Sequence, residues 1–484
     1  MHLALMGTAL LSLTATSLAK NFADPAPPTV NEPSGEAITK TEEFDRVTYF
    51  QDPKPLSPDA VVADWPRFLG PDDDVKSPET HLLNEFPEDG PAKVWELEKG
   101  TGYTSAIIAD DRLVLFDRID DEETIDCLDP ETGKRYWHAA YPVTYADRYG
   151  FKNGPRASAV INSGKVYTLG VTSTLSCFDL ATGTLLWQRD LGSEFSVATF
   201  FFGHGSCPLV FEGKVIVPLG TDDNLSVAAF DQHTGKLIWG TEHEWNAGYA
   251  SPIVLTLQGA PRLLVYGGGE SDPAIGGLMC IDPDTGELFD SFPWRAPKYE
   301  SVNGSTPVAC GDDRVYISDA YEIGGVMLRL NFELKWEEVY RLPDFGLHWN
   351  APLYLGDALY GFRGRNEPDA WLASYDVESG KENWRADPEW TVPLPTGRDY
   401  RMRYFRGSFL HADEKTYALG ELGSLGIFKL NPEELIELDK TQLFIARSTW
   451  SSPVVHRGLL YISQHESSMD GTPPRLICYD LRRE

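Results

Sequence analysis

Hydrophobic and polar positions alternate in short runs along most of the chain. Many apolar runs follow Ser-Ala, Ser-Pro or Thr-Pro, and a Gly or an Asp-Asp pair divides each run in two, as in SAIIADDRLVLF and SAVINSGKVYTLG. Apolar runs of this length on both sides of a turn residue are typical of β-hairpins. The pattern therefore predicts an all-β protein, and the 43 Gly and 34 Pro residues agree with many turns.

A short motif follows each hairpin. Its clear copies are CLDPETGKRYW (127–137), CFDLATGTLLW (177–187), AAFDQHTGKLIW (228–239) and SYDVESGKENW (374–384). Asp-x-x-Thr-Gly predicts a turn, because the Asp caps its own backbone and the Gly accepts positive φ. A strand on each side of this turn brings the repeat to four antiparallel strands, which is typical of one propeller blade.

Counting the repeats gives the number of blades. The innermost strands are expected to begin near Ser105, Ser158, Cys207, Ser251, Thr306, Ala351, Ser408 and Ser452. The last copy, CYDLRRE (478–484), stops before its fourth strand, and an orphan strand, AKVWELE (92–98), precedes the first copy. We therefore predict an eight-bladed β-propeller over residues 61–484, closed by the strand around Trp95 pairing with the C-terminal blade. Closure removes exposed sheet edges.

The repeated residues themselves are expected to be structural. Propeller symmetry spreads the turn Asp residues around the ring, so they cannot converge on one metal ion. Cys127, Cys177, Cys280 and Cys478 share one repeat position, which keeps them farther apart than the Cα distance of about 7 Å that a disulfide tolerates. We therefore predict unpaired cysteines. The aromatic residues predicted to pack between blades are Trp95, Trp137, Trp187, Trp239, Trp336 and Trp384.

The motif resembles the tryptophan-docking repeat of the pyrroloquinoline quinone (PQQ)-like eight-bladed propellers. Asp64-Trp65-Pro66-Arg67-Phe68-Leu69-Gly70-Pro71 is also similar to the Trp-Pro-x-x-Arg-Gly-Pro opening of one branch of that repeat, with a departure at Arg67-Phe68-Leu69. The resemblance covers residues 64–484 and implies the fold. It does not imply one function, because the same repeat serves quinoprotein alcohol dehydrogenases and the non-enzymatic outer-membrane assembly factor BamB.

The N-terminal residues indicate export. Residues 3–19 are apolar and uncharged, and Ser17-Leu18-Ala19 fits a cleavage site, so residues 1–19 are predicted to be a signal peptide. The alternative is an uncleaved apolar anchor. Residues 20–60 are rich in Pro and acidic residues, and we predict an extended or disordered linker there. No later segment is apolar enough to span a membrane. From the signal peptide we expect a periplasmic or secreted protein, and we expect it to be a monomer.

The charge of the chain limits its partners. Lys and Arg total 42 and Asp and Glu total 73, so the net charge is 42 − 73 = −31. Such a charge repels phosphate backbones, and no run of basic residues offsets it. The sequence therefore predicts no nucleic-acid partner.

The segments that enter the innermost strands are unusually polar and aromatic. In a propeller these connections converge on one mouth of the central channel. The predicted ring of ligand-binding residues around that mouth is Tyr103, Arg156, His204, Trp245, Tyr249, Asn303, His348, Trp349, Arg406 and Trp450. The two His and two Arg would make a locally positive funnel for a small polar, anionic or polyhydroxylated ligand. The alternative interpretation is that these bulky side chains only fill the channel.

No catalytic or metal-binding residues are assigned from the sequence. It contains no adjacent cysteines, no Cys-x-x-Cys-His, no Gly-x-Ser-x-Gly and no His-Glu-x-x-His. The calcium ligands of the quinoprotein enzymes cannot be placed on matching positions. Two hypotheses follow: a non-enzymatic binding or scaffold module for a protein partner or small ligand, or a PQQ- and Ca²⁺-dependent dehydrogenase acting on alcohols or sugars.

Overall fold

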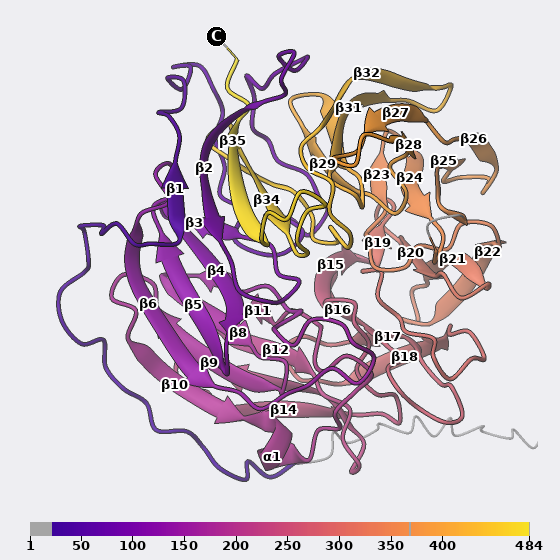
Figure 1. Cartoon of the computed structure of the whole chain (residues 1–484). Helices are drawn as coiled ribbons and strands as arrows, with labels where there is room; N and C mark the ends of the chain where they lie inside the picture. Colours follow the sequence, from indigo (N-terminus) through magenta and orange to yellow (C-terminus); the bar gives the residue numbers. More distant parts are fainter. Residues whose placement is uncertain (1–21, 367–368, 484) are drawn as a thin grey trace, which may run out of the picture.

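A computed structural model describes residues 22–366 and 369–483. The predicted signal peptide lies outside the described residues. Within them, eight antiparallel sheets surround a common centre, seven of four strands and one of five, and a two-stranded hairpin is added (Figure 1). This confirms the all-β, eight-bladed propeller. No described helix is long and apolar enough to cross a membrane.

The first four blades follow one another along the chain, each beginning with its innermost strand. Blade 1 contains β3 (Ile107–Ala109), β4 (Arg112–Ile119), β5 (Glu122–Leu128) and β6 (Arg135–Pro142). Blade 2 contains β7 (Val160–Asn162), β8 (Lys165–Leu169), β9 (Thr174–Asp179) and β10 (Leu185–Asp190), and the short helix α1 (Leu191–Phe195) follows it. Blade 3 contains β11 (Leu209–Phe211), β12 (Lys214–Pro218), β13 (Leu225–Asp231) and β14 (Leu237–Glu242). Blade 4 contains β15 (Ile253–Leu257), β16 (Ala260–Gly267), β17 (Gly277–Ile281) and β18 (Leu288–Pro293).

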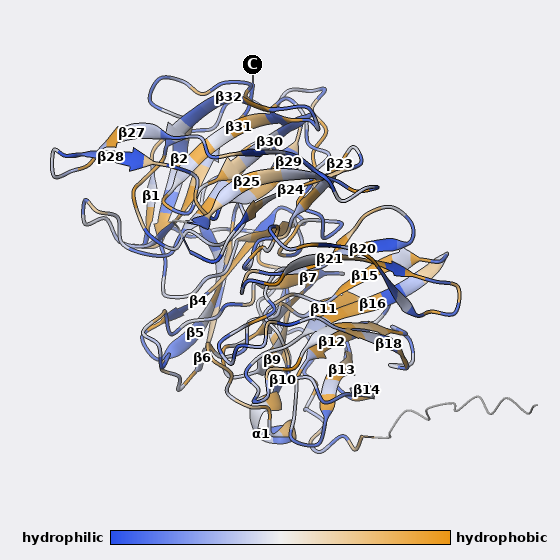
Figure 2. Cartoon of the chain, turned by 90° about the vertical axis from the view of Figure 1, so that its right-hand side faces the viewer, coloured by the Kyte–Doolittle hydropathy of each residue, from blue (hydrophilic) through white to orange (hydrophobic). Residues whose placement is uncertain are grey.

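The remaining blades complete the ring. Blade 5 contains β19 (Val308–Ala309), β20 (Arg314–Asp319), β21 (Gly324–Leu330) and β22 (Trp336–Leu342). Blade 6 contains β23 (Leu353–Leu355), β24 (Ala358–Arg363), β25 (Trp371–Asp376) and β26 (Glu382–Ala386). The hairpin of β27 (Trp390–Pro393) and β28 (Asp399–Met402) projects between blades 6 and 7 (Figure 2). Blade 7 contains β29 (Ser408–Ala412), β30 (Lys415–Leu419), β31 (Ser424–Leu430) and β32 (Leu435–Gln442). Blade 8 contains β33 (Val454–His456), β34 (Leu459–Gln464), β35 (Arg475–Asp480), β2 (Ala92–Glu98) and β1 (Val47–Tyr49).

The two ends of the described chain close the ring. Strand β2 pairs antiparallel with β35, and Trp95 lies opposite Cys478 (Figure 1). This confirms the predicted closure. The Trp95 ring is fully buried among apolar side chains of blades 1, 7 and 8, so blade 8 joins residues that are far apart in sequence through one core.

Tryptophan docking links one blade to the next. The Trp95 indole donates to the carbonyl oxygen of Pro130 at 2.9 Å, and a Cβ added to Gly133 would lie 2.8 Å from the Trp95 ring. Gly133 has φ +69°, so the turn needs a glycine for its backbone as well as for the ring. The same arrangement pairs Trp137 with Gly183, Trp187 with Gly235 and Trp239 with Gly286.

The docking residue of blade 5 differs from the prediction. Tyr340, not Trp336, lies opposite Met327 in the register that Trp137 has opposite Cys127 in blade 1. The Tyr340 hydroxyl donates to the carbonyl oxygen of Val377 in blade 6 at 2.7 Å. Trp336 is buried in a core cluster of blades 4 and 5, as expected for a residue packed between blades, but it does not occupy the docking register. The blade 5 turn lacks the Thr-Gly sequence that marks this register in the clear copies.

All six cysteines are buried and unpaired, as predicted. Hydroxyl groups near the starts of the innermost strands connect neighbouring blades around the axis. The backbone N–H of Ser105 donates to the Ser158 hydroxyl at 2.9 Å, and that of Ser251 donates to the Thr306 hydroxyl at 3.3 Å. These bonds fix the spacing of the innermost strands around the channel.

The segment of residues 61–83, which we call the strap, crosses the face where the innermost strands end. Trp65 exchanges two backbone hydrogen bonds with Ile108 of blade 1, and Val75 accepts one from His411 of blade 7. Phe68 packs against a core cluster of blades 2 and 3 and against another of blades 5 to 7. The strap therefore lies across the axis and covers this end of the channel.

The described part of the predicted linker, residues 22–60, is extended and lies against the propeller. The described part of this segment follows the outer edges of blades 3, 2, 1 and 8 in an extended course (Figure 1). The Asp24 carboxylate accepts from the backbone N–H of Leu237, the Asn31 backbone N–H donates to the carbonyl of Leu186, and β1 pairs with β2. The composition of this segment could not indicate its path, because its hydrogen-bond partners lie on the propeller blades and not within the segment.

Candidate binding site at the channel mouth

The connections that enter the innermost strands lie on the face opposite the strap, which we call the mouth. Antiparallel pairing requires this, because each innermost strand runs from the mouth toward the strap. The mouth comprises residues 99–106, 143–159, 196–208, 243–252, 294–307, 343–352, 403–407 and 443–453.

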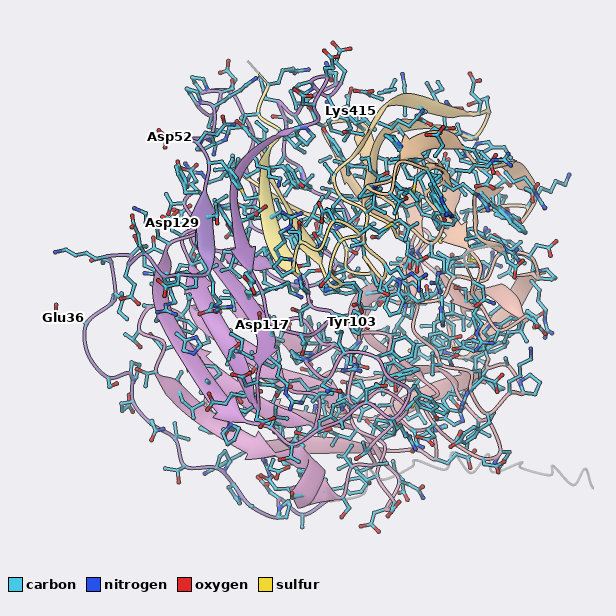
Figure 3. All side chains as sticks on the ribbon, in the orientation of Figure 1. Glu36, Asp52, Tyr103, Asp117, Asp129 and Lys415 are labelled. Atoms are coloured by element: carbon cyan, nitrogen blue, oxygen red, sulfur yellow. The ribbon has the colours of Figure 1, made fainter. Side chains whose placement is uncertain are left out.

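A stack of aromatic side chains occupies the mouth. The ring of Tyr103 lies 5.1 Å from Trp450 with an interplanar angle of 26°, Trp450 lies 4.6 Å from Trp349, and Trp349 lies 4.4 Å from His348. Blades 1, 8 and 6 contribute these residues, and Tyr103 is labelled near the middle of the view in Figure 3. The structure thus brings together four of the predicted site residues.

An ion pair holds this stack in place. The guanidinium of Arg406 lies 4.4 Å from the Trp349 ring centre and donates through Nε to Oε2 of Glu421 at 2.8 Å. The Trp450 indole donates to Oε1 of the same carboxylate at 2.8 Å. Glu421 is buried in the turn between β30 and β31, and the sequence offered no motif that marked it.

The predicted positive funnel is not formed. Arg406 is neutralised by Glu421, and Arg156 pairs with Asp147 at 2.8 Å. Burial lowers the pKa of His204 to about 4 and holds the pKa of His348 well below its usual range, so both imidazoles are neutral at pH 7. No motif in the sequence marked the two acidic partners: Asp147 precedes Arg156 in the same connection, and Glu421 lies in the turn between β30 and β31.

Three predicted residues have roles inside the blades. His204 is buried and its Nδ1 lies 3.1 Å from the hydroxyl of Ser173. Trp245 packs in the core cluster of blades 3 and 4. The amide of Asn303 donates to the carbonyl oxygen of Gly267 at 2.7 Å. These side chains support the mouth from below and are buried.

The surface of the mouth is more aromatic than the sequence indicated. The hydroxyl of Tyr249 accepts from the backbone N–H of Phe202, whose ring also contacts Tyr149 and Phe151. The Phe151 ring lies 6.0 Å from Trp450, which joins these rings to the central stack. The three consecutive phenylalanines in Thr199-Phe200-Phe201-Phe202 could have indicated part of this cluster from the sequence.

The outermost rings of this cluster are exposed. The exposed fractions are 52% for Tyr149, 41% for Phe151 and 49% for Tyr299. Phe201 is buried between Tyr149 and Tyr299, with ring centres 6.0 and 5.1 Å away. We call Tyr149, Phe151 and Tyr299 the aromatic patch. Contiguous exposed rings of this kind mark binding surfaces more often than single exposed rings do.

A buried lysine lies beneath the stack. Lys99 Nζ lies 3.1 Å from Nδ1 of His465, and Nε2 of His465 lies within hydrogen-bond distance of the Ser451 hydroxyl. Burial lowers the pKa of Lys99 to about 8 and lowers that of His465 well below its usual range. Because Lys99 donates to Nδ1, the imidazole carries its proton on Nε2 and donates to Ser451. This hydrogen-bond direction does not activate the serine as a nucleophile.

The described residues of the mouth form ring contacts with one another and show no cluster of His, Cys, Asp and Glu side chains. Among them, no three His, Cys, Asp or Glu side chains are grouped as a metal ion would require. One face of Trp450 is stacked on Tyr103, and Arg406 lies over Trp349, so both indole rings already have a partner within the chain.

Eight four-stranded blades, tryptophan docking and an aromatic mouth define a PQQ-like β-propeller. The family model described as outer membrane protein assembly factor BamB matches residues 121–386, more than half of the chain. The protein therefore belongs to this family of PQQ-like propellers.

The individual relatives include both an assembly factor and dehydrogenases. The dehydrogenase subunit of the quinone alcohol dehydrogenase of Acetobacter aceti is 29% identical over 239 residues, which are 46% of this chain and 29% of that relative. The match thus spans less than a third of the relative's length.

Solved structures show the same fold at low identity. BamB from Moraxella catarrhalis has a TM-score of 0.52 at 14% identity, with 81% of this chain and 98% of that chain covered. Quinohemoprotein alcohol dehydrogenase from Comamonas testosteroni has a TM-score of 0.60 at 12% identity, with 87% and 81% covered. At these identities the likeness concerns the fold alone.

Proposed function

We propose that the protein is an exported, non-enzymatic binding module that holds a protein partner in the cell envelope through the mouth. The observation that carries this proposal is the exposed aromatic patch, which adjoins the stack of Tyr103, Trp450 and Trp349 through Phe151. The rings of the stack already contact one another, and the exposed rings of the patch favour an apolar contact surface.

The charges around the patch support a protein partner over a small anion. Arg148 pairs with Glu270, which also accepts the hydroxyl of Tyr299, and Lys152 pairs with Glu466 at 2.8 Å. Because these charges are already paired, recognition falls to the rings. Tyr, Phe and Arg are enriched at the centres of protein interfaces. The expected partner therefore presents apolar side chains to the patch.

The cell envelope is proposed from two features. The apolar N-terminal segment predicts export, and the family model carries the description of an outer-membrane assembly factor. The mature protein would then act in the periplasm or outside the cell.

Site-specific photo-crosslinking tests this function. A benzoylphenylalanine at Phe151 is expected to crosslink one discrete protein in intact cells, and this product is expected to disappear when Tyr149 and Tyr299 are changed to Ser. The matched control is the same crosslinker at Phe332, which is 91% exposed in the turn between β21 and β22 on the opposite face. Equal crosslinking at both positions, or none at Phe151, would reject the proposal.

A PQQ- and Ca²⁺-dependent dehydrogenase is the second candidate, because the Acetobacter aceti relative is a quinone alcohol dehydrogenase. Addition of PQQ and Ca²⁺ to the purified protein, followed by a dye-linked assay on alcohols and sugars, distinguishes the two. Cofactor-dependent dye reduction would favour the enzyme, and its absence would remove this candidate.

A further inference from the structure

A polar cavity lies beside the mouth, between blades 5 and 6. Its volume is about 320 Å³. One wall is the end of β20 with the turn after it, which carry Asp319, Tyr321 and Glu322. The other wall is the end of β24 with Arg365 just after it, and Arg363 is the last residue of that strand. A cavity of this size suits a small molecule and not a protein segment.

Aromatic rings hold the two arginines of this cavity in place. The guanidinium of Arg363 lies 3.8 Å from the ring centre of Trp371, and that of Arg365 lies 4.2 Å from the ring centre of Tyr321. Stacking on a ring orders the side chain and leaves the edge of the planar guanidinium free to donate. The two donors are therefore preorganised before any ligand binds.

In the part of the chain that the structure describes, neither guanidinium lies within 4 Å of a carboxylate oxygen. Arg406 and Arg403, also near the mouth, each pair with an acidic side chain. Nε of Arg363 is buried with no hydrogen-bond partner among the described atoms. The cavity therefore carries two guanidiniums that have no ion-pair partner among the described residues.

The acidic side chains of the cavity have donors of their own. The two oxygens of Asp319 accept from the backbone N–H groups of Ala296 at 2.9 Å and Tyr321 at 2.8 Å. Glu322 pairs with Lys298 at 2.6 Å. Asp369 lines the same cavity, with its carbonyl oxygen accepting from Arg363 at 3.1 Å. The acidic groups of the cavity are thus already hydrogen-bonded, and the groups that can still bind a ligand are the guanidinium donors of Arg363 and Arg365.

We propose that this cavity binds a small organic carboxylate through Arg363 and Arg365. A carboxylate matches the flat edge of a guanidinium with two parallel hydrogen bonds, and the acidic wall opposite disfavours ligands of higher charge such as phosphate. This site is separate from the aromatic patch and does not depend on the proposed function, so crosslinking at Phe151 neither supports nor removes it.

Titration calorimetry of the full chain tests the site with acetate, malonate, inorganic phosphate and sulfate. A carboxylate is expected to bind at one site, about ten- to a hundredfold more weakly in Arg365→Gln, because a charge-assisted hydrogen bond is lost. Arg365→Lys keeps the charge without the planar fork and is expected to fall in between. Arg341→Gln, an exposed arginine of blade 5 paired with Glu338, is the control and is expected to bind like the wild type.

The proposal fails if neither carboxylate binds, or if Arg365→Gln and Arg341→Gln bind carboxylate equally well. Binding of phosphate or sulfate without carboxylate would also overturn it. A near-ultraviolet circular dichroism spectrum equal to that of the wild type shows that a variant is folded. If Arg365→Gln does not fold, Arg365→Lys alone decides the result.

Discussion

Replacing the docking glycines tests how far tryptophan docking determines the stability of the ring. Gly133 has φ +69°, and a Cβ there would lie 2.8 Å from the Trp95 ring. Gly164 has φ +70°, and nothing lies within 4 Å of the added Cβ. Both are turn glycines with the same backbone conformation. The difference between Gly133→Ala and Gly164→Ala therefore isolates the contact with the ring.

The expected magnitudes follow from two separate effects. An alanine held in the left-handed region costs about 1 to 2 kcal/mol, and this cost applies to both variants. A contact of 2.8 Å forces the indole or the turn to shift, and such overpacking costs about 1 to 3 kcal/mol more. We expect Gly164→Ala to destabilise by about 1 kcal/mol and Gly133→Ala by about 3 kcal/mol.

Urea unfolding followed by tryptophan fluorescence and by far-ultraviolet circular dichroism measures both variants. Agreement of the two signals shows whether a single free energy of unfolding applies. Gly183→Ala, with a Cβ 2.7 Å from the Trp137 ring, is expected to behave like Gly133→Ala. Equal losses of stability in Gly133→Ala and Gly164→Ala would refute the reasoning, since the ring contact would then add nothing to the backbone effect.

Three further predictions concern the mouth and the closure. Lys99 has a pKa of about 8 in the folded protein against 10.5 ordinarily, so the unfolded chain holds its proton to higher pH and stability rises between pH 8 and 10.5. The free energy of unfolding of the wild type is expected to rise by about 3 kcal/mol over this pH range. Urea unfolding of Lys99→Met at pH 8 and pH 10.5 is expected to show no such rise. Glu421→Gln leaves Arg406 unpaired in a buried site and is expected to lower the free energy of unfolding by about 3 to 5 kcal/mol, measured by thermal unfolding. The double variant Glu421→Leu with Arg406→Leu removes both charges and is expected to lose less stability. Equal losses in the two variants would contradict the ion-pair argument. Trp95→Ala is expected to cost about 3 to 5 kcal/mol, and a loss below 1 kcal/mol in urea unfolding would show that closure does not depend on this ring.

Several features of the fold were determined by the sequence alone. The repeated turn motif specified blades of four strands, and the orphan strand around Trp95 specified the closure opposite Cys478. These features are readable because they depend on local chemistry: alternation fixes which side chains are buried, and a turn needs particular residues at particular positions. Where the turn chemistry was missing, in blade 5, the sequence indicated Trp336 although Tyr340 is the docking residue.

Only the tertiary structure decided the nature of the mouth. The sequence placed Tyr103, His348, Trp349 and Trp450 on one face, but not their stacking, nor the pairing of Arg406 with a carboxylate from the β30–β31 turn. It also gave no sign that the linker of residues 20–60 follows the blade edges. The physical reason is that the ring contacts join connections from different blades, and that the Arg406–Glu421 pair joins two segments of blade 7 that no local motif relates. Their distances depend on how the whole ring closes, and no local pattern along the chain records that.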